Sequence, residues 1–204
     1  MLTLKIYKPT NFILLAACSG ALFFNFSTQP ADSQLNVIPT VAAKTVNKTQ
    51  DITKVKVTAN QAIKVFTDKY AETDVKSLSL EKKHGKYYYE VEGVGDKKEH
   101  ELKIDANSKK IIDTDTDTLD PVEQKGVKRA EEKIKAKKLL TVKQAVKAAQ
   151  KKVKSGTVTE VSLDQSLGIT YWEVNFKQAD KKVEVNVDAQ SGKFLSKETS
   201  EIDD

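Results

Sequence analysis

The clearest feature of the chain is a pattern of hydrophobic and polar positions that occurs twice. Over residues 62–70 and again over 145–153, apolar residues recur every three to four positions, which predicts a helix with one buried face. After each helix the period changes to two, over residues 75–83, 87–93 and 99–105 and then over 158–165, 170–176 and 183–188. Such alternation is typical of half-buried strands. Each copy is therefore predicted to be a helix followed by three strands, and a final turn leads into a short fourth strand or an extended tail.

A constant offset of 83 residues relates the two copies and aligns residues 58–112 with residues 141–195 without a gap. Each copy begins with a capping box, in which threonine and a glutamine three residues later cap each other's backbone N–H groups. These pairs are Thr58 with Gln61 and Thr141 with Gln144. Short connections between the alternating runs predict antiparallel hairpins. The expected fold class is α+β, with two tandem α-β-β-β modules, each a helix packed on an antiparallel sheet.

The segment between the modules is predicted to be an acidic connector followed by a basic helix. The connector covers residues 113–119, where aspartate alternates with threonine up to Thr118 and no hydrophobic face forms. Asp120, Pro121 and Glu123 match the preferences for the N-cap, N1 and N3 positions of a helix. We expect this helix to continue to about Lys138 and to connect the two modules.

The N-terminal region predicts export from the cytoplasm. Lys5 and Lys8 precede an apolar run over residues 12–26, which is shorter than the roughly 20 residues of a transmembrane helix. The sequence Leu-Ala-Ala-Cys that ends at Cys18 resembles the bacterial lipobox, in which the cysteine is lipidated. Conventional cleavage after Ala43 and an uncleaved anchor remain open. The expected location is extracytoplasmic, either membrane-anchored at the cell surface as a lipoprotein or secreted.

These signals divide the chain into five segments. They are a signal peptide or membrane anchor over 1–26, a flexible tether over 27–56, a first module over 57–116, a linker helix over 117–139 and a second module over 140–200. The tether is assigned because this segment is polar and shows no sustained periodicity. The oligomeric state and the relative orientation of the modules stay open.

Motifs and composition favour no enzyme, cofactor or metal site. The two histidines, His84 and His100, form no metal-binding motif, and no nucleotide-binding or hydrolase motif occurs. The acidic run that starts at Asp113 does not match a calcium-binding loop. Thr118 replaces the glycine of the turn, and Gln124 stands where such a loop has its final bidentate carboxylate. The net charge of +5 on 204 residues does not predict nucleic-acid binding.

Two surfaces are candidate binding sites. Strand alternation places Tyr89 and Trp172 toward the helix-covered core. The opposite face then carries residues that recur in both copies: Tyr88, Glu90, Tyr171 and Glu173. These residues either contact a partner or stabilise neighbouring strands. The second surface is the basic region 125–154, which either contacts anionic lipid and wall polymer or is simply solvated. Its candidate contacts are Lys128, Arg129, Lys135 and Lys138.

The capped helices, the hairpin residues 85–91 and the ending over residues 187–194 resemble PepSY domains. The resemblance covers both copies, about 120 of the 204 residues. In the first copy Lys109 replaces the family's turn glycine, so we expect a looser turn there. The resemblance implies a non-catalytic envelope module that regulates or inhibits an extracellular peptidase. The alternative is a structural or sensory envelope protein that binds anionic polymer or lipid through its basic central helix.

Overall fold

Each repeat contributes one main helix and four strands. The computed structural model describes residues 51–202. The first repeat contains η1 (Ile52–Lys54), α1 (Ala59–Lys69), β1 (Asp74–Lys83), β2 (Lys86–Val94), β3 (Lys98–Asp105) and β4 (Ile111–Thr118). The short helix α2 (Val127–Glu132) follows it. The second repeat contains α3 (Val142–Gln150), β5 (Thr157–Ser166), β6 (Ile169–Lys177), β7 (Lys181–Asp188) and β8 (Phe194–Glu201).

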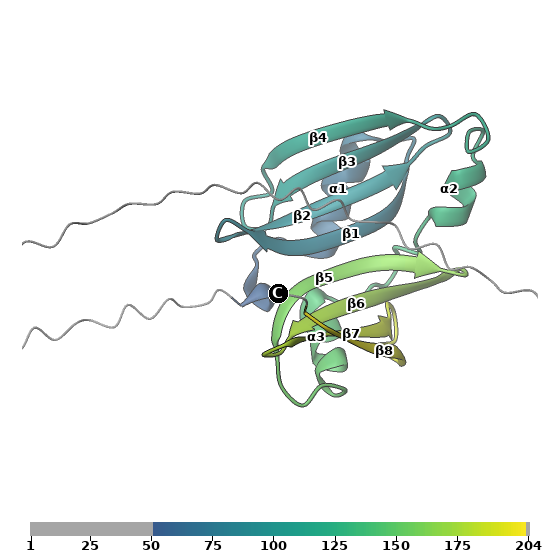
Figure 1. Ribbon diagram of the computed structural model, residues 1–204. Helices are drawn as coiled ribbons and strands as arrows, with labels where there is room; N and C mark the ends of the chain where they lie inside the picture. The colour runs from purple at the N-terminus through teal and green to yellow at the C-terminus, as the bar shows by residue number, and fades with distance from the viewer. Residues whose placement is uncertain (1–50, 203–204) are drawn as a thin grey trace, which may run out of the picture. The chain divides into compact units, whose positions relative to one another are not determined.

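All eight strands form one antiparallel sheet in the order β4-β3-β2-β1-β5-β6-β7-β8. Helices α1 and α3 lie on the same face of this sheet (Figure 1). The predicted mixture of helix and antiparallel sheet in two repeats is confirmed. The prediction that each module forms a sheet of its own is wrong, because β1 and β5 pair with each other and join the strands of both repeats in one sheet. The expected short fourth strand or extended tail is an eight-residue strand in each repeat, β4 and β8.

The pairing of β1 with β5 gives the repeats an approximate twofold symmetry. Ser79 lies directly opposite Ser162, and these two residues are equivalent under the 83-residue offset. The approximate axis therefore passes through this pair, normal to the sheet. Every position on the first four strands has a symmetry-related position on the second four, so the two repeats can be compared residue by residue.

The acidic run at 113–117 belongs to β4 and is not a connector. It pairs with β3 in regular antiparallel register, with Asp115 opposite Glu101. All eight residues of β4 are exposed, because β4 is an edge strand beyond the reach of α1. From Asp113 to Thr118 this strand has no apolar face, and its backbone pairing with β3 makes it a strand. This is why a hydrophobic pattern could not reveal it.

The basic helix predicted over 120–138 is also wrong, because α2 has only six residues. Lys125 and Gly126 both have positive φ angles, 60° and 81°, so the chain turns sharply before the helix starts. After it, the N–H group of Ile134 donates to the carbonyl oxygen of Val75 at 3.0 Å, and the Ile134 side chain is buried. Burial of Ile134 against the sheet holds the chain extended there and ends the helix.

The N-terminal predictions mostly lie outside the described residues. This holds for the 1–26 leader, for Cys18 and for most of the 27–56 tether. The last residues of that tether are part of the fold, since η1 packs near β1, β5 and α3 and buries Ile52 to 3% exposure.

Both main helices begin as the sequence predicts and cover one continuous core. The capping boxes of Thr58 with Gln61 and of Thr141 with Gln144 are both present. Tyr89 and Trp172 are fully buried on the helix side, as predicted. The core runs without a break from the first repeat to the second, because the sheet itself is continuous.

The two repeats fill the space between helix and sheet with opposite combinations of large and small residues. In the first repeat the helix supplies Phe66 and the strand supplies Gly93, where a Cβ atom would lie 2.5 Å from Phe66 Cε1. At the equivalent places the second repeat has Ala149 on the helix and Phe176 on the strand, both buried. A ring is thus retained in each repeat but comes from the opposite side of the interface.

The turn after the third strand of each repeat has the same structure in both copies. Asp105 Oδ1 accepts hydrogen bonds from Ser108 N and Oγ, and Asp188 Oδ1 accepts equivalent bonds from Ser191. Lys109 has a φ angle of 63° where Gly192 has 71°. The expectation of a looser first turn is therefore wrong. The aspartate bonds hold Lys109 in a left-handed conformation that ordinarily disfavours a residue with a Cβ atom.

Candidate functional site

The face of the sheet opposite α1 and α3, called here the open face, carries the residues singled out by strand alternation. The pairing register places eight side chains in one row across all strands: Asp113, Lys103, Glu90, Ser79, Ser162, Glu173, Asn186 and Ser196. Glu90 and Glu173 therefore lie at symmetry-related places on either side of the central serine pair. Three strand spacings separate them, or about 14 Å.

The two candidate tyrosines lie in the neighbouring rows. Tyr88 pairs with Glu81 on one side and Asp105 on the other, and Tyr171 pairs with Asp164 and Asp188. Both tyrosines are half-buried. Burial, together with the nearby Asp164 and Glu173 carboxylates, raises the pKa of Tyr171 to about 12. The structure thus brings all four candidates to one face, and their role in binding stays a prediction.

Acidic residues dominate the open face, and in the first repeat lysines offset them. Lys103 Nζ lies 3.0 Å from Glu90 Oε2, and Lys76 Nζ lies 2.9 Å from Glu92 Oε2. Lys76 also contacts Glu99 at 3.1 Å. Burial alone would lower the pKa of Lys103, but the hydrogen bond and charge of Glu90 outweigh it and raise this pKa. The first repeat therefore pairs Glu90 and Glu92 on its open face with internal cations.

The second repeat lacks both of these lysines. The residue equivalent to Lys103 is Asn186, and the residue equivalent to Lys76 is Thr159. Within residues 51–202, neither Glu173 nor Glu184 has an ion-pair partner within 4.0 Å. Burial, and then the neighbouring Glu184 carboxylate, raises the pKa of Glu173 to about 7. Burial also raises the pKa of Glu160 on the adjacent strand.

Asparagine side chains occupy the space between these carboxylates. Asn175 Nδ2 donates to Glu173 Oε1 at 3.0 Å and to Glu160 Oε2 at 3.4 Å. Asn186 Nδ2 donates to Glu184 Oε1 at 3.4 Å. The strand alternation alone did not single out either asparagine. A comparison of the two repeats could have found Asn186, because it replaces Lys103 of the first repeat on the same face.

The four basic candidates have different surroundings. Arg129 is engaged with Asp74 at 2.9 Å and with Asp96 at 3.3 Å. Lys128 lies between Glu99 and Glu123, at 3.1 and 3.3 Å. Both basic side chains of α2 are therefore paired with carboxylates of the same chain.

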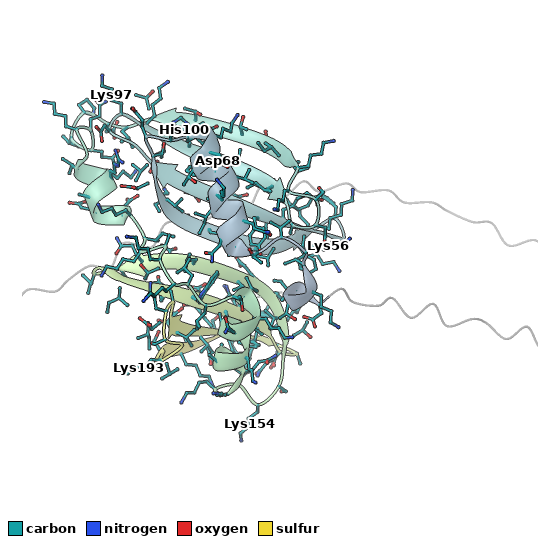
Figure 2. All side chains as sticks on the ribbon, turned by 180° about the vertical axis from the view of Figure 1, so that it is seen from behind. Lys56, Asp68, Lys97, His100, Lys154 and Lys193 are labelled. Carbon is teal, nitrogen blue, oxygen red and sulfur yellow. The ribbon has the colours of Figure 1, made fainter. Side chains whose placement is uncertain are left out.

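The other two basic candidates lie beyond α2. Lys135 Nζ donates to the carbonyl oxygen of Gly168 at 2.8 Å, and Lys138 is exposed. Other lysines, including Lys56 and Lys154, extend outward in the view from the helix side (Figure 2). Exposed positive charge is therefore spread over the surface and not concentrated on one central helix.

The described residues show no arrangement typical of a metal centre. Across residues 51–202, no three His, Cys, Asp or Glu side chains are placed to hold a metal ion. His100 lies beside α1 (Figure 2), where its ring stacks on Tyr70 with 4.1 Å between ring centroids. No helix in this part of the chain is both long and apolar enough to cross a membrane.

Comparison with known proteins identifies both repeats. The family model described as peptidase propeptide and YPEB domain, PepSY, matches residues 56–115 and 139–198. The crystal structure of "a putative lipoprotein" from Clostridium difficile 630 is similar, with a TM-score of 0.70 and 35% sequence identity. The match covers 74% of this chain and 99% of that one. No curated protein matches the chain. The chain therefore belongs to the PepSY family, whose domain it contains twice in tandem.

Proposed function

We propose that the protein is a non-catalytic binding module of the cell envelope and that its open face contacts a protein partner. The observation that carries this proposal is the recurrence of one tyrosine and one glutamate at symmetry-related places on this face: Tyr88 with Glu90, and Tyr171 with Glu173. Half-buried tyrosines held by a sheet offer contact area at a small cost in conformational entropy. The family description favours an extracellular peptidase as the partner, bound by occlusion and not by chemistry.

Replacement of both Tyr88 and Tyr171 by serine is expected to weaken capture of the partner more than tenfold. Tyrosines at the centre of an interface contribute about 2 kcal/mol or more when truncated. Because both side chains are partly exposed, the free energy of unfolding is expected to change by only about 0.5 kcal/mol at each position. The measurement is capture of envelope peptidases from an extract, beside thermal unfolding of the same variant.

The matched control is Leu167→Ser, since Leu167 is 93% exposed in the β5–β6 turn and lies outside the rows of the open face. We expect this variant to capture the partner as wild type does. If the tyrosine variant also captures at the wild-type level, the open face is not the binding surface. A loss of stability without a separable binding defect would assign these residues to strand stabilisation.

The alternative function is attachment to anionic lipid or wall polymer through basic residues. The engagement of Lys128 and Arg129 with carboxylates makes α2 a weaker candidate for this role than an unpaired basic helix. The alternative requires binding to anionic vesicles that weakens steeply as salt increases. The same protein preparation can be tested for both activities. Peptidase capture that anionic vesicles do not reduce favours binding of a protein partner over attachment to anionic lipid or polymer.

Both comparisons favour an extracytoplasmic location, and we propose that Cys18 is the lipid attachment site. The similarity to the Clostridium difficile protein agrees with the motif that ends at Cys18. The Cys18→Ala variant is expected to be released from membranes or to retain its leader. Membrane fractionation and the mobility of the protein on a gel test this. Wild-type fractionation and mobility of the variant would exclude lipidation, and a mature N-terminus at Lys44 would indicate conventional cleavage.

A further inference from the structure

Four polar side chains on β6 and β7 form a compact group on the open face of the second repeat. We call Glu173, Asn175, Glu184 and Asn186 the amide–carboxylate quartet. Glu173 lies opposite Asn186, and Asn175 lies opposite Glu184, so the carboxylates occupy one diagonal and the carboxamides the other. Glu160 on β5 and Glu198 on β8 flank the group.

The quartet has more hydrogen-bond acceptors than donors. The carboxamide oxygens of Asn175 and Asn186 are both buried and have no hydrogen-bond partner. Asn175 as a whole is only 1% exposed. Its Nδ2 group already donates to Glu173 and Glu160. Buried acceptors without donors are rare in folded proteins and ask for an explanation.

The first repeat shows how the same framework is completed. At the place equivalent to Asn186 it has Lys103, whose ammonium group lies 3.0 Å from Glu90. Glu90 is the equivalent of Glu173. An ammonium group supplies three donors and a full positive charge, which are what the quartet lacks. The framework of the fold therefore accommodates a lysine side chain at this point.

We propose that the amide–carboxylate quartet binds a lysine or arginine side chain of a partner polypeptide, which takes the place that Lys103 occupies in the first repeat. The inference rests on the proposed binding function of the open face and adds the chemistry of the contact. The cationic side chain donates to Glu173 and Glu184. The side chains of Asn175 and Asn186 lie on the same side of the sheet, and their carboxamide oxygens can accept its remaining N–H groups after a rotation that exposes them.

A cationic side chain fits the quartet better than a metal ion does. Within residues 51–202, the carboxylates are not arranged to ligate a metal ion. Lysine and arginine need no such convergent ligand sphere, because each N–H group donates along its own direction. The tyrosines on the open face also offer rings that can contact the aliphatic part of a basic side chain.

Binding of a cation is expected to depend on pH. Burial and Glu184 raise the pKa of Glu173 to about 7, so near neutrality Glu173 is partly protonated in the free protein. The cation binds the ionised form, so affinity increases as pH rises through this range and levels off above it. The charged and titratable groups around Glu173 are Glu160 and Asp164 on β5, Tyr171 on β6, and Lys182, Glu184 and Asp188 on β7.

The decisive variant is Asn186→Lys, which restores the lysine of the first repeat. The full exported protein is titrated by calorimetry with a blocked heptapeptide that alternates alanine and lysine, and with a matched peptide that has glutamine in place of lysine. We expect the lysine peptide to bind wild type and the glutamine peptide not to bind. The Asn186→Lys variant is expected to bind the lysine peptide about tenfold more weakly, because an internal ammonium group occupies the site.

Two further variants separate occupancy of the site from general charge. Asn107→Lys adds the same charge in the β3–β4 turn, and its affinity is expected to stay near wild type. Lys103→Asn removes the internal lysine of the first repeat and is expected to create a second binding site, visible as a stoichiometry of two. Glu173→Gln is expected to weaken binding and to flatten its pH dependence.

Equal loss of affinity in Asn186→Lys and Asn107→Lys would overturn the proposal, since the added net charge would then explain the weaker binding in both variants. Binding of calcium alone that Asn186→Lys abolishes would also overturn it, in favour of a metal site. Unchanged peptide affinity in Asn186→Lys, together with loss of partner capture in the tyrosine variant, would leave the proposed function intact and remove the cation site. If both binding effects are absent, the proposed function fails as well.

Discussion

Truncation of Trp172 to alanine is expected to lower the free energy of unfolding by about 3–5 kcal/mol, the usual range for a buried large aromatic side chain. Trp172 is fully buried on β6, with Leu163 opposite on β5 and Val187 opposite on β7. Removal of the ring leaves a cavity beneath α3 at the centre of the second repeat. Because the core continues into the first repeat, we expect one cooperative transition at lower denaturant concentration.

Trp172→Phe is the matched control. The indole Nε1 atom is buried and has no hydrogen-bond partner among the described residues, so loss of this group forfeits no hydrogen bond. The phenylalanine variant is therefore expected to lose much less stability than the alanine variant. Chemical denaturation followed by circular dichroism measures both. A change below about 1 kcal/mol in Trp172→Ala would contradict the buried position of this side chain.

The second large effect is expected at the interface between Phe66 of α1 and Gly93 of β2. Phe66→Ala is expected to cost about 3–5 kcal/mol, because the ring is fully buried. Gly93→Phe in the wild-type background is expected to be strongly destabilising as well. Even its Cβ atom would lie 2.5 Å from the Phe66 ring and 2.8 Å from the carbonyl oxygen of Asp74.

The double variant Phe66→Ala with Gly93→Phe reproduces the combination of Ala149 and Phe176 in the second repeat. We expect its loss in free energy of unfolding to be smaller than the summed losses of the two single variants by about 1–3 kcal/mol, the range found for residues in contact. Recovery is expected to be partial, because the Asp74 carbonyl oxygen remains close to the new side chain. Additive losses in the two single variants would show that a ring on β2 cannot replace the ring of α1 in the first repeat.

The candidate site could be predicted in part from the sequence. Strand alternation identified the face that carries Tyr88 and Tyr171, because consecutive side chains of a strand point to opposite sides. The grouping of Glu173 with Asn186 could not be predicted, since it depends on the register between β6 and β7. A shift of one residue would move every side chain of a strand to the other face.

The local elements were determined by the sequence itself. Thr58 and Thr141 start the two helices through contacts within four residues, and the alternating runs choose their buried faces by hydrophobicity alone. Such signals act over short distances along the chain and can be recognised without knowledge of the fold. The duplication could also be recognised from the sequence, because equivalent elements need equivalent residues.

The tertiary structure alone decided how these elements combine. The joining of β1 and β5 is a backbone pairing between strands that are 83 residues apart, and backbone hydrogen bonds carry no sequence signature. The exposed edge strand β4 and the short helix α2 were mispredicted for related reasons. β4 is held by pairing with β3, and α2 is ended by the burial of Ile134. In each case a long-range contact overrides the local preference, since local propensities differ by less free energy than such contacts contribute.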